Sequence, residues 1–182
     1  RLATEKQCLE TAERIVATSP QEQEHMRSLV SLHGNIDIIP CGTDTERFGR
    51  VSRAEARRVL GLDRDAKIVF YVGRFDRRKG IETAVRAVGQ LKRENLQLII
   101  GGGSRPGQSD GMERDRIEGI VNELGLQEMT SFPGRLGIEN LHLYYAAADV
   151  CVVPSHYEPF GLVSIEAMAS GTPVVASDVG GL

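Results

Sequence analysis

Short apolar runs rich in β-branched residues alternate with segments of helical periodicity along this 182-residue chain. Each run is nearly continuous in apolar residues, as strands are when both of their faces are buried. Such alternation is typical of a parallel sheet with helices on both faces. The expected strands are residues 14–18, 36–39, 67–72, 96–100, 129–132, 149–153 and 173–177. The sequence therefore predicts an α/β fold, formed by a single domain over residues 1–182.

Helical periodicity and capping patterns define the connecting segments. Apolar residues recur at helical spacing over residues 81–91 and 117–124, and Gly125 is expected to end the second helix. Ser19 and Ser52 are each followed three residues later by Glu, which is typical of the first turn of a helix. The two periodic segments, 81–91 and 117–124, should be amphipathic helices that cover the sheet.

A polar, glycine-rich loop is expected over residues 101–111, directly after a strand. Loops in this position often bind ligands in α/β folds. The glycines do not fit the G-x-G-x-x-G fingerprint, because the spacing fails at Pro106. The sequence therefore disfavours NAD binding.

Composition and charge exclude several kinds of partner. The net charge of -3 and the pI near 5.9 leave no broad basic field, so nucleic-acid binding is disfavoured. No apolar run approaches the length that crosses a bilayer, so we expect no transmembrane segment. The three cysteines are far apart and odd in number, which favours reduced thiols and a cytoplasmic protein. Three of the four histidines have no second ligand at metal spacing, so no metal site is expected.

A basic stretch follows the strand that is expected to end at Val72. Residues 73–80 read Gly-Arg-Phe-Asp-Arg-Arg-Lys-Gly and precede a predicted helix. A strand-to-helix turn presents free amides and the positive end of the helix dipole, which stabilise an anion. Arg74 and Lys79 add two cations, each able to form a charge-assisted hydrogen bond worth about 1.5 to 3 kcal/mol. The stretch fits a diphosphate site, and a solvated basic turn is the alternative.

Two glutamates mark a second candidate site, after the strand 149–153. Apolar residues occupy nearly every face of the predicted helix 161–170, so we expect the helix to be buried, with Glu166 as its only charge. A buried carboxylate requires a hydrogen-bond donor from a ligand or from the protein. Glu158 precedes the helix, on another side of its first turn. Each carboxylate is suited to accept hydrogen bonds from a vicinal diol, and an internal salt bridge is the alternative for Glu166.

Several of these stretches together resemble a known family of enzymes. Residues 73–80, 154–161 and 166–176 carry its motifs, and Glu158 and Glu166 have its E-x7-E spacing. The segment Ile-Pro-Cys-Gly-Thr-Asp before Phe48 is similar to its I-P-N-G-V-D segment, with Cys where Asn is commoner. The chain resembles the retaining GT-B glycosyltransferases of group 1, or family 4, over nearly its whole length. Within that family it is most similar to sucrose-phosphate synthases and inositol-phosphate glycosyltransferases.

The resemblance implies a fold and a set of site residues. Such enzymes have two facing Rossmann-like domains, of which the second binds the donor and the first supplies most of the acceptor site. By resemblance, Arg74 and Lys79 bind the donor diphosphate, Glu166 accepts the ribose hydroxyls and Glu158 holds the sugar. Backbone amides of residues 160–162 aid Glu158, and the base lies near Arg135 and Leu136. The residues assigned to catalysis are Arg74, Lys79 and Glu158, and those assigned to substrate binding are Gly73, Arg135, Leu136, His156, Phe160, Gly161, Leu162 and Glu166.

The function implied is retaining transfer of a hexose from a nucleotide-diphospho-sugar, with a UDP-hexose favoured. Cleavage of the sugar–phosphate bond makes the diphosphate more negative, and the two cations and the helix amides could stabilise it without a metal ion. The chain lacks an initiating Met and ends directly after a predicted strand, so we expect an inactive fragment whose partner domain is absent. A GT-B-fold epimerase or phosphorylase, or a non-catalytic nucleotide-binding module, are the alternatives.

Overall fold

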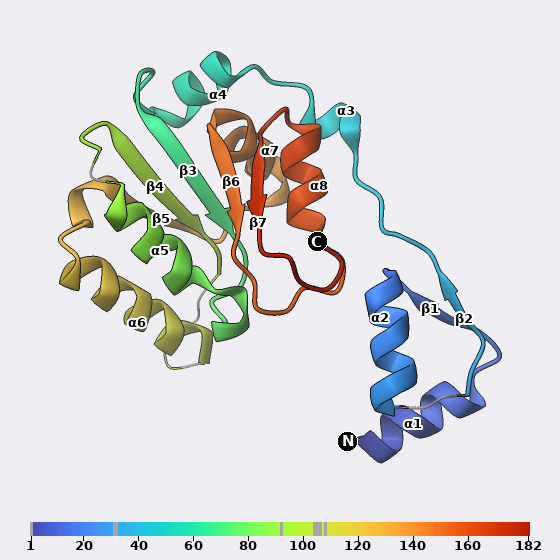
Figure 1. Ribbon diagram of the computed structural model, residues 1–182. Coiled ribbons are helices and arrows are strands. Elements are labelled where there is room, and N and C mark those ends of the chain that lie inside the picture. Colours follow the sequence, from blue (N-terminus) through green and yellow to red (C-terminus); the bar gives the residue numbers. More distant parts are fainter. Residues whose placement is uncertain (1, 31–32, 92, 104–106, 108) are drawn as a thin grey trace.

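The computed structural model describes residues 2–30, 33–91, 93–103, 107 and 109–182. Five parallel strands form the main sheet, in the order β5-β4-β3-β6-β7 (Figure 1). These strands are β3 (Lys67–Val72), β4 (Leu96–Gly101), β5 (Thr130–Gly134), β6 (Val150–Val153) and β7 (Val174–Ala176). The predicted parallel α/β sheet is confirmed for these five strands, whose ends differ by a few residues from those predicted.

The two strands nearest the N-terminus form a sheet of their own. β1 (Ile15–Ala17) pairs in parallel with β2 (Ile36–Ile38), and neither pairs with the five-stranded sheet in the described part of the chain. Together with α1 (Leu2–Thr11), α2 (Pro20–His25) and the π-helical turn η1 (Met26–Val30), they make up what we call the N-terminal segment. Figure 1 shows this segment beside the main sheet, joined to it by an extended stretch before α3 (Thr45–Phe48).

Helices cover both faces of the five-stranded sheet. Along β3, Val69 and Tyr71 pack with α5 (Ile81–Gln90) and α6 (Ser109–Glu123), whereas Ile68 and Phe70 pack with α7 (Ile138–Ala147) and α8 (Leu162–Ala169). This alternation follows from the period of two in a strand. The remaining helical elements are α4 (Arg53–Leu60), which packs on α7, and the 3-10 turns η2 (Arg77–Lys79) and η3 (Gln127–Met129).

The helix ends confirm most of the predicted caps. The hydroxyls of Ser19 and Ser52 each accept a hydrogen bond from the amide three residues on, and Gly125 has φ +67° after α6. The Glu22 carboxylate accepts from the amide and the hydroxyl of Thr18, one residue earlier than a capping box requires. Helix α6 begins at Ser109, so the loop after β4 is shorter than predicted; its residues 104–106 and 108 lie outside the described residues.

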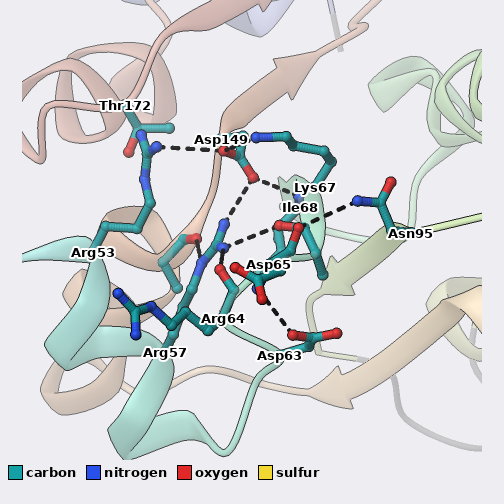
Figure 2. Close-up of polar contacts among 12 residues, drawn as sticks. Arg53, Arg57, Asp63, Arg64, Asp65, Lys67, Ile68, Asn95, Asp149 and Thr172 are labelled. Carbon is teal, nitrogen blue, oxygen red and sulfur yellow. Dashed lines mark hydrogen bonds and ion pairs between the residues drawn. The ribbon is translucent and has the colours of Figure 1, made fainter.

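A buried arginine joins the helices to the amino ends of the strands (Figure 2). Arg57 is only 6% exposed, and its guanidinium lies 2.7 Å from the Asp149 carboxylate. Asp149 in turn accepts from the amide of Ile68 at 2.8 Å. The other guanidinium protons go to the carbonyl oxygens of Arg64, Ala66 and Ala147. This cluster fixes α4, β3 and β6 at the end of the sheet away from the candidate site.

No helix in the described residues combines the length and the apolar composition that crossing a membrane requires.

Candidate functional site

The loops that follow β3 and β6 pack against each other at the carboxyl edge of the sheet. The amide of His156 donates to the carbonyl oxygen of Arg78 at 2.7 Å. Gly80 has φ +63°, and a Cβ atom there would collide with the carbonyl oxygen of Pro154. Only glycine allows this approach of the two backbones. The two motifs singled out in the sequence therefore meet in one site.

Lys79 and Glu158 form an ion pair where these loops meet. The Lys79 ammonium lies 2.6 Å from Oε2 of Glu158, and the Ser155 hydroxyl donates to the same oxygen at 3.2 Å. The two charged side chains are 22% and 15% exposed, so water screens the pair only in part. Sequence reasoning assigned these residues to different parts of the donor and did not predict their contact.

The other basic residues of the stretch 73–80 have separate surroundings. Arg78 pairs with Asp76 at 2.6 Å, and these hydrogen bonds lower the pKa of the Asp76 carboxyl. Arg77 lies 3.6 Å from Glu113 on α6. The exposed Arg74 makes no ion pair with a described residue and lines a cleft of about 780 Å³ that opens toward α6. The structure thus places Lys79 at Glu158, but it does not bring the Arg74 side chain to that point.

The amino end of α8 has no side-chain cap in the described part of the chain, and the Leu182 side chain lies against Gly161 there. Gly161, at φ +95°, is the N-cap residue of the helix. The Ser164 amide bonds to the Gly161 carbonyl at 2.9 Å, while the buried Ser164 hydroxyl has no partner among described residues. The half-buried Phe160 and the exposed Leu162 flank this end. Uncapped amides at a helix start, together with the dipole, favour an anion.

The prediction that α8 is buried on nearly every face is wrong. Leu162 is 46% exposed and Met168 is 57% exposed. The helix buries only the side that carries Ser164 and Ala167. The described part of the chain therefore leaves some of the apolar side chains of α8 exposed.

Glu166 has a protein donor, as its position in the helix required. The hydroxyl of Tyr145 on α7 donates to Oε2 of Glu166 at 2.7 Å. Burial raises the pKa of the Glu166 carboxyl, and the Tyr145 hydrogen bond opposes that rise. No cation of the described residues pairs with Glu166, so the internal salt bridge is not observed. Sequence reasoning missed Tyr145, although a tyrosine in a buried helix needs a partner for its hydroxyl.

The residues expected near the base lie at the same edge of the sheet, after β5. The Leu136 side chain packs over Gly101, at the end of β4. The exposed Arg135 reaches the backbone at Gly103, the next loop along the edge. Gly73 bonds through its amide to the Gly101 carbonyl at 3.1 Å, which extends the ladder between β3 and β4. All the predicted site residues therefore lie at or near one edge.

In the part of the chain that the structure describes, no group of three or more His, Cys, Asp or Glu side chains is placed to hold a metal ion.

Sequence similarity to known proteins extends over nearly the whole chain. D-inositol 3-phosphate glycosyltransferases from Nocardia farcinica and Mycolicibacterium gilvum are 42% and 39% identical over 98% and 100% of this chain. The chain spans only 40% of the length of either relative.

Solved structures share the fold. Sucrose-phosphate synthase from Thermosynechococcus elongatus matches 100% of this chain and 44% of its own, with a TM-score of 0.92 and 55% identity. Anabaena HepE, solved with UDP and glucose, matches 99% of this chain and 48% of its own, with a TM-score of 0.86 and 25% identity. Both are consistent with the GT-B fold inferred from the motifs. The family model "Glycosyl transferases group 1" matches residues 52–182, and the chain therefore belongs to the group 1 glycosyltransferases.

Proposed function

We propose that this chain is the donor-binding part of a retaining glycosyltransferase that transfers a hexose from a UDP-hexose. The observation that carries the proposal is the ion pair between Lys79 and Glu158 close to the uncapped amino end of α8, at one edge of the sheet. A cation and uncapped helix amides suit the diphosphate, and a carboxylate beside them suits sugar hydroxyls. The solved structure of HepE with UDP and glucose, on the same fold, supports this choice of donor.

Each part of the donor has proposed partners. Lys79 and the amides of residues 160–162 bind the diphosphate, and Arg74, at the start of the same loop, leaves the cleft beside α6 to join them when the donor binds. Glu158, with His156 beside it, holds the hexose hydroxyls. Glu166 accepts the ribose hydroxyls, and the base lies against Arg135 and Leu136 near Gly73. The family's preference for this arrangement supports the assignment of Glu158 and Glu166 through their E-x7-E spacing.

The leaving diphosphate gains negative charge in the transition state, and groups already directed at it lower the barrier. We propose that Lys79, Arg74 and the α8 amides supply this stabilisation and that no metal ion is required. Addition of EDTA should then leave turnover unchanged, and a loss that Mg²⁺ restores would contradict the proposal. The relatives are more than twice as long as this chain, so we place the acceptor site in a further domain of the whole enzyme.

Calorimetry with UDP and UDP-glucose tests the donor site. Lys79→Ala should weaken both by about 10- to 100-fold, since it removes a charge-assisted contact to the diphosphate. Lys67→Ala is the matched control, because Lys67 lies at the other end of β3 and is 55% exposed. Absence of UDP binding by the unaltered chain, or equal effects of both substitutions, would overturn the proposal. In the whole enzyme, a glycoside as product would exclude an epimerase or a phosphorylase.

A further inference from the structure

Tyr145 is a large buried side chain close to Glu166, and contacts hold both its ring and its backbone. It is fully buried, and its ring meets the rings of Phe48 and Phe70 edge-on, with centroids 5.7 Å and 5.4 Å away. Its backbone carbonyl accepts from the Thr172 hydroxyl at 2.6 Å. The phenol hydroxyl therefore has a fixed position in the fold.

Glu166, which accepts the hydrogen bond from that hydroxyl, is also held in place by the packing of its own helix. Glu166 lies on α8, and the amide of Thr172, just beyond this helix, bonds to the Ala167 carbonyl at 3.0 Å. Thr172 thus connects the end of α8 to the backbone of Tyr145. The distance of 2.7 Å between the hydroxyl and Oε2 of Glu166 is consequently set by two packed helices and not by a flexible loop.

We propose that Tyr145 is a positioning residue for Glu166, whose carboxylate it directs toward the ribose hydroxyls of the nucleotide. This inference rests on the proposed function. A glutamate has three rotatable side-chain bonds, and ordering them on binding costs free energy. Tyr145 orders the carboxylate before the ligand arrives. It holds Oε2, whereas Oε1 accepts no hydrogen bond from a described residue and remains for the ligand.

The same contact also favours the charged form of Glu166, although burial leaves the pKa of its carboxyl raised. Burial favours the neutral acid, whereas a hydrogen bond donated by Tyr145 favours the carboxylate. The other titratable group that senses Glu166 in the described residues is Cys151 on β6; burial, aided by the Glu166 charge, raises the pKa of its thiol to about 12. That thiol is neutral under ordinary conditions. Tyr145 is therefore the one described side chain that opposes protonation of Glu166.

Tyr145→Phe tests the proposal in the full chain, because it removes the hydroxyl and keeps the buried ring. We expect UDP to bind about tenfold more weakly, and 2'-deoxy-UDP to lose less. The ratio of wild-type to variant affinity should be larger near about pH 6 than near about pH 8.5. Loss of the hydrogen bond raises the pKa of Glu166, so at the lower pH more of the variant than of the wild type carries the neutral acid. Protonation of the UDP phosphates affects both proteins equally and cancels in the ratio.

Tyr144→Phe is the matched control, since Tyr144 stacks on Phe70 from the same helix and makes no hydrogen bond to Glu166. It should change neither the affinity nor its dependence on pH. Equal losses in the two variants, or a Tyr145→Phe loss that is the same at both pH values and for both nucleotides, would overturn the positioning role.

A measurement without nucleotide separates this inference from the proposed function. Titration of the Glu166 side chain by carbon-13 NMR should show a higher pKa in Tyr145→Phe than in wild type. An unchanged titration would refute the role of Tyr145 even if UDP binds. Failure of the wild type to bind UDP, with a raised pKa in the variant, would refute the proposed function, while the effect of Tyr145 on Glu166 would stand. If Tyr145→Phe does not fold, Glu166→Asp replaces it: the shorter side chain keeps the charge but moves the carboxylate away from the Tyr145 hydroxyl, so UDP should bind more weakly and 2'-deoxy-UDP should lose less. Equal losses for the two nucleotides would overturn the inference.

Discussion

The ammonium of Lys79 lies 2.6 Å from the carboxylate of Glu158. The cation proposed for the diphosphate and the carboxylate proposed for the hexose therefore neutralise each other. A diphosphate that draws Lys79 away also releases Glu158, which then becomes available to sugar hydroxyls. In our proposal, recognition of the two halves of the donor is therefore coupled through this ion pair.

Glu158→Gln should distinguish the contribution of the diphosphate to donor binding from that of the hexose. Lys79 loses its competing partner, so UDP should bind about three- to tenfold more tightly, whereas the additional affinity for UDP-glucose over UDP should disappear. Calorimetry with both ligands gives the two numbers. Glu82→Gln is a control, because Glu82 pairs with arginines of α5 and α6 and not with Lys79. Weaker UDP binding by Glu158→Gln would show that the pair does not compete with the diphosphate.

Gly80→Ala should damage the site through the backbone. A Cβ atom there would meet the Pro154 carbonyl, and φ is +63°. We expect a loss of several kcal/mol of unfolding free energy, seen as a large fall in Tm. Gly61→Ala is the matched control: Gly61 has φ +65° but open space around its Cβ position, so the cost should be about 1 kcal/mol. Equal losses would mean that the approach of the two loops is easily relaxed.

Asp149→Asn should weaken the cluster around Arg57 in a manner that depends on pH. Burial alone would raise the pKa of Asp149, but hydrogen bonds from Ile68 and Arg57 outweigh it, and the pKa is lowered. A lowered pKa stabilises the fold above the unfolded-state value, and this stabilisation is lost as the pH falls through the folded-state value. Near neutral pH we expect a loss of about 3 kcal/mol, because the substitution leaves the buried Arg57 cation poorly paired.

The check is urea unfolding at several pH values. The difference between wild type and Asp149→Asn should shrink once the pH falls below about 4, where the unfolded Asp takes up its proton. The Arg14–Asp37 pair is exposed on both sides, so Asp37→Asn should cost less than about 1 kcal/mol. A difference for Asp149→Asn that does not vary with pH would contradict the role assigned to its charge.

Most of the fold followed from local patterns, and the exceptions share one physical cause. The run Ile15–Ala17 is as apolar as β6, so its composition marks it as a strand but cannot say with which strand it pairs. Helix α8 is apolar on most faces, but burial depends on which neighbours cover it, and Met168 is exposed. Pairing and covering are tertiary facts that no local period encodes.

The candidate site shows the same division. Lys79 and Glu158 were identified by the chemistry of their own segments, but 79 residues separate them, and their contact depends on two loops meeting in the fold. Tyr145 carried no signal of its own, because its role arises from the packing of α7 beside α8. The sequence therefore predicted the chemical groups of the site and not the contacts between them.

Ser19 connects the N-terminal segment to the loop that carries Glu158. Its buried hydroxyl accepts from the Glu22 amide at 3.1 Å, which caps α2, and donates to the Pro159 carbonyl at 2.7 Å. His25 of the same helix stacks on Tyr157, with ring centroids 5.9 Å apart. These contacts hold the two residues that flank Glu158 along the chain.

Ser19→Ala should therefore have two effects. Loss of the cap should lower the unfolding free energy by about 1 kcal/mol, and the freed loop should weaken UDP-glucose binding more than UDP binding, since Glu158 contacts only the sugar in our proposal. Ser52→Ala is the matched control: Ser52 caps α4 in the same way, at 3.3 Å, and has no contact with that loop. It should lose similar stability without any change in affinity. If Ser19→Ala leaves the ratio of the two affinities unchanged, the bond to Pro159 serves packing alone, because an altered position of Glu158 would change the affinity for UDP-glucose relative to that for UDP.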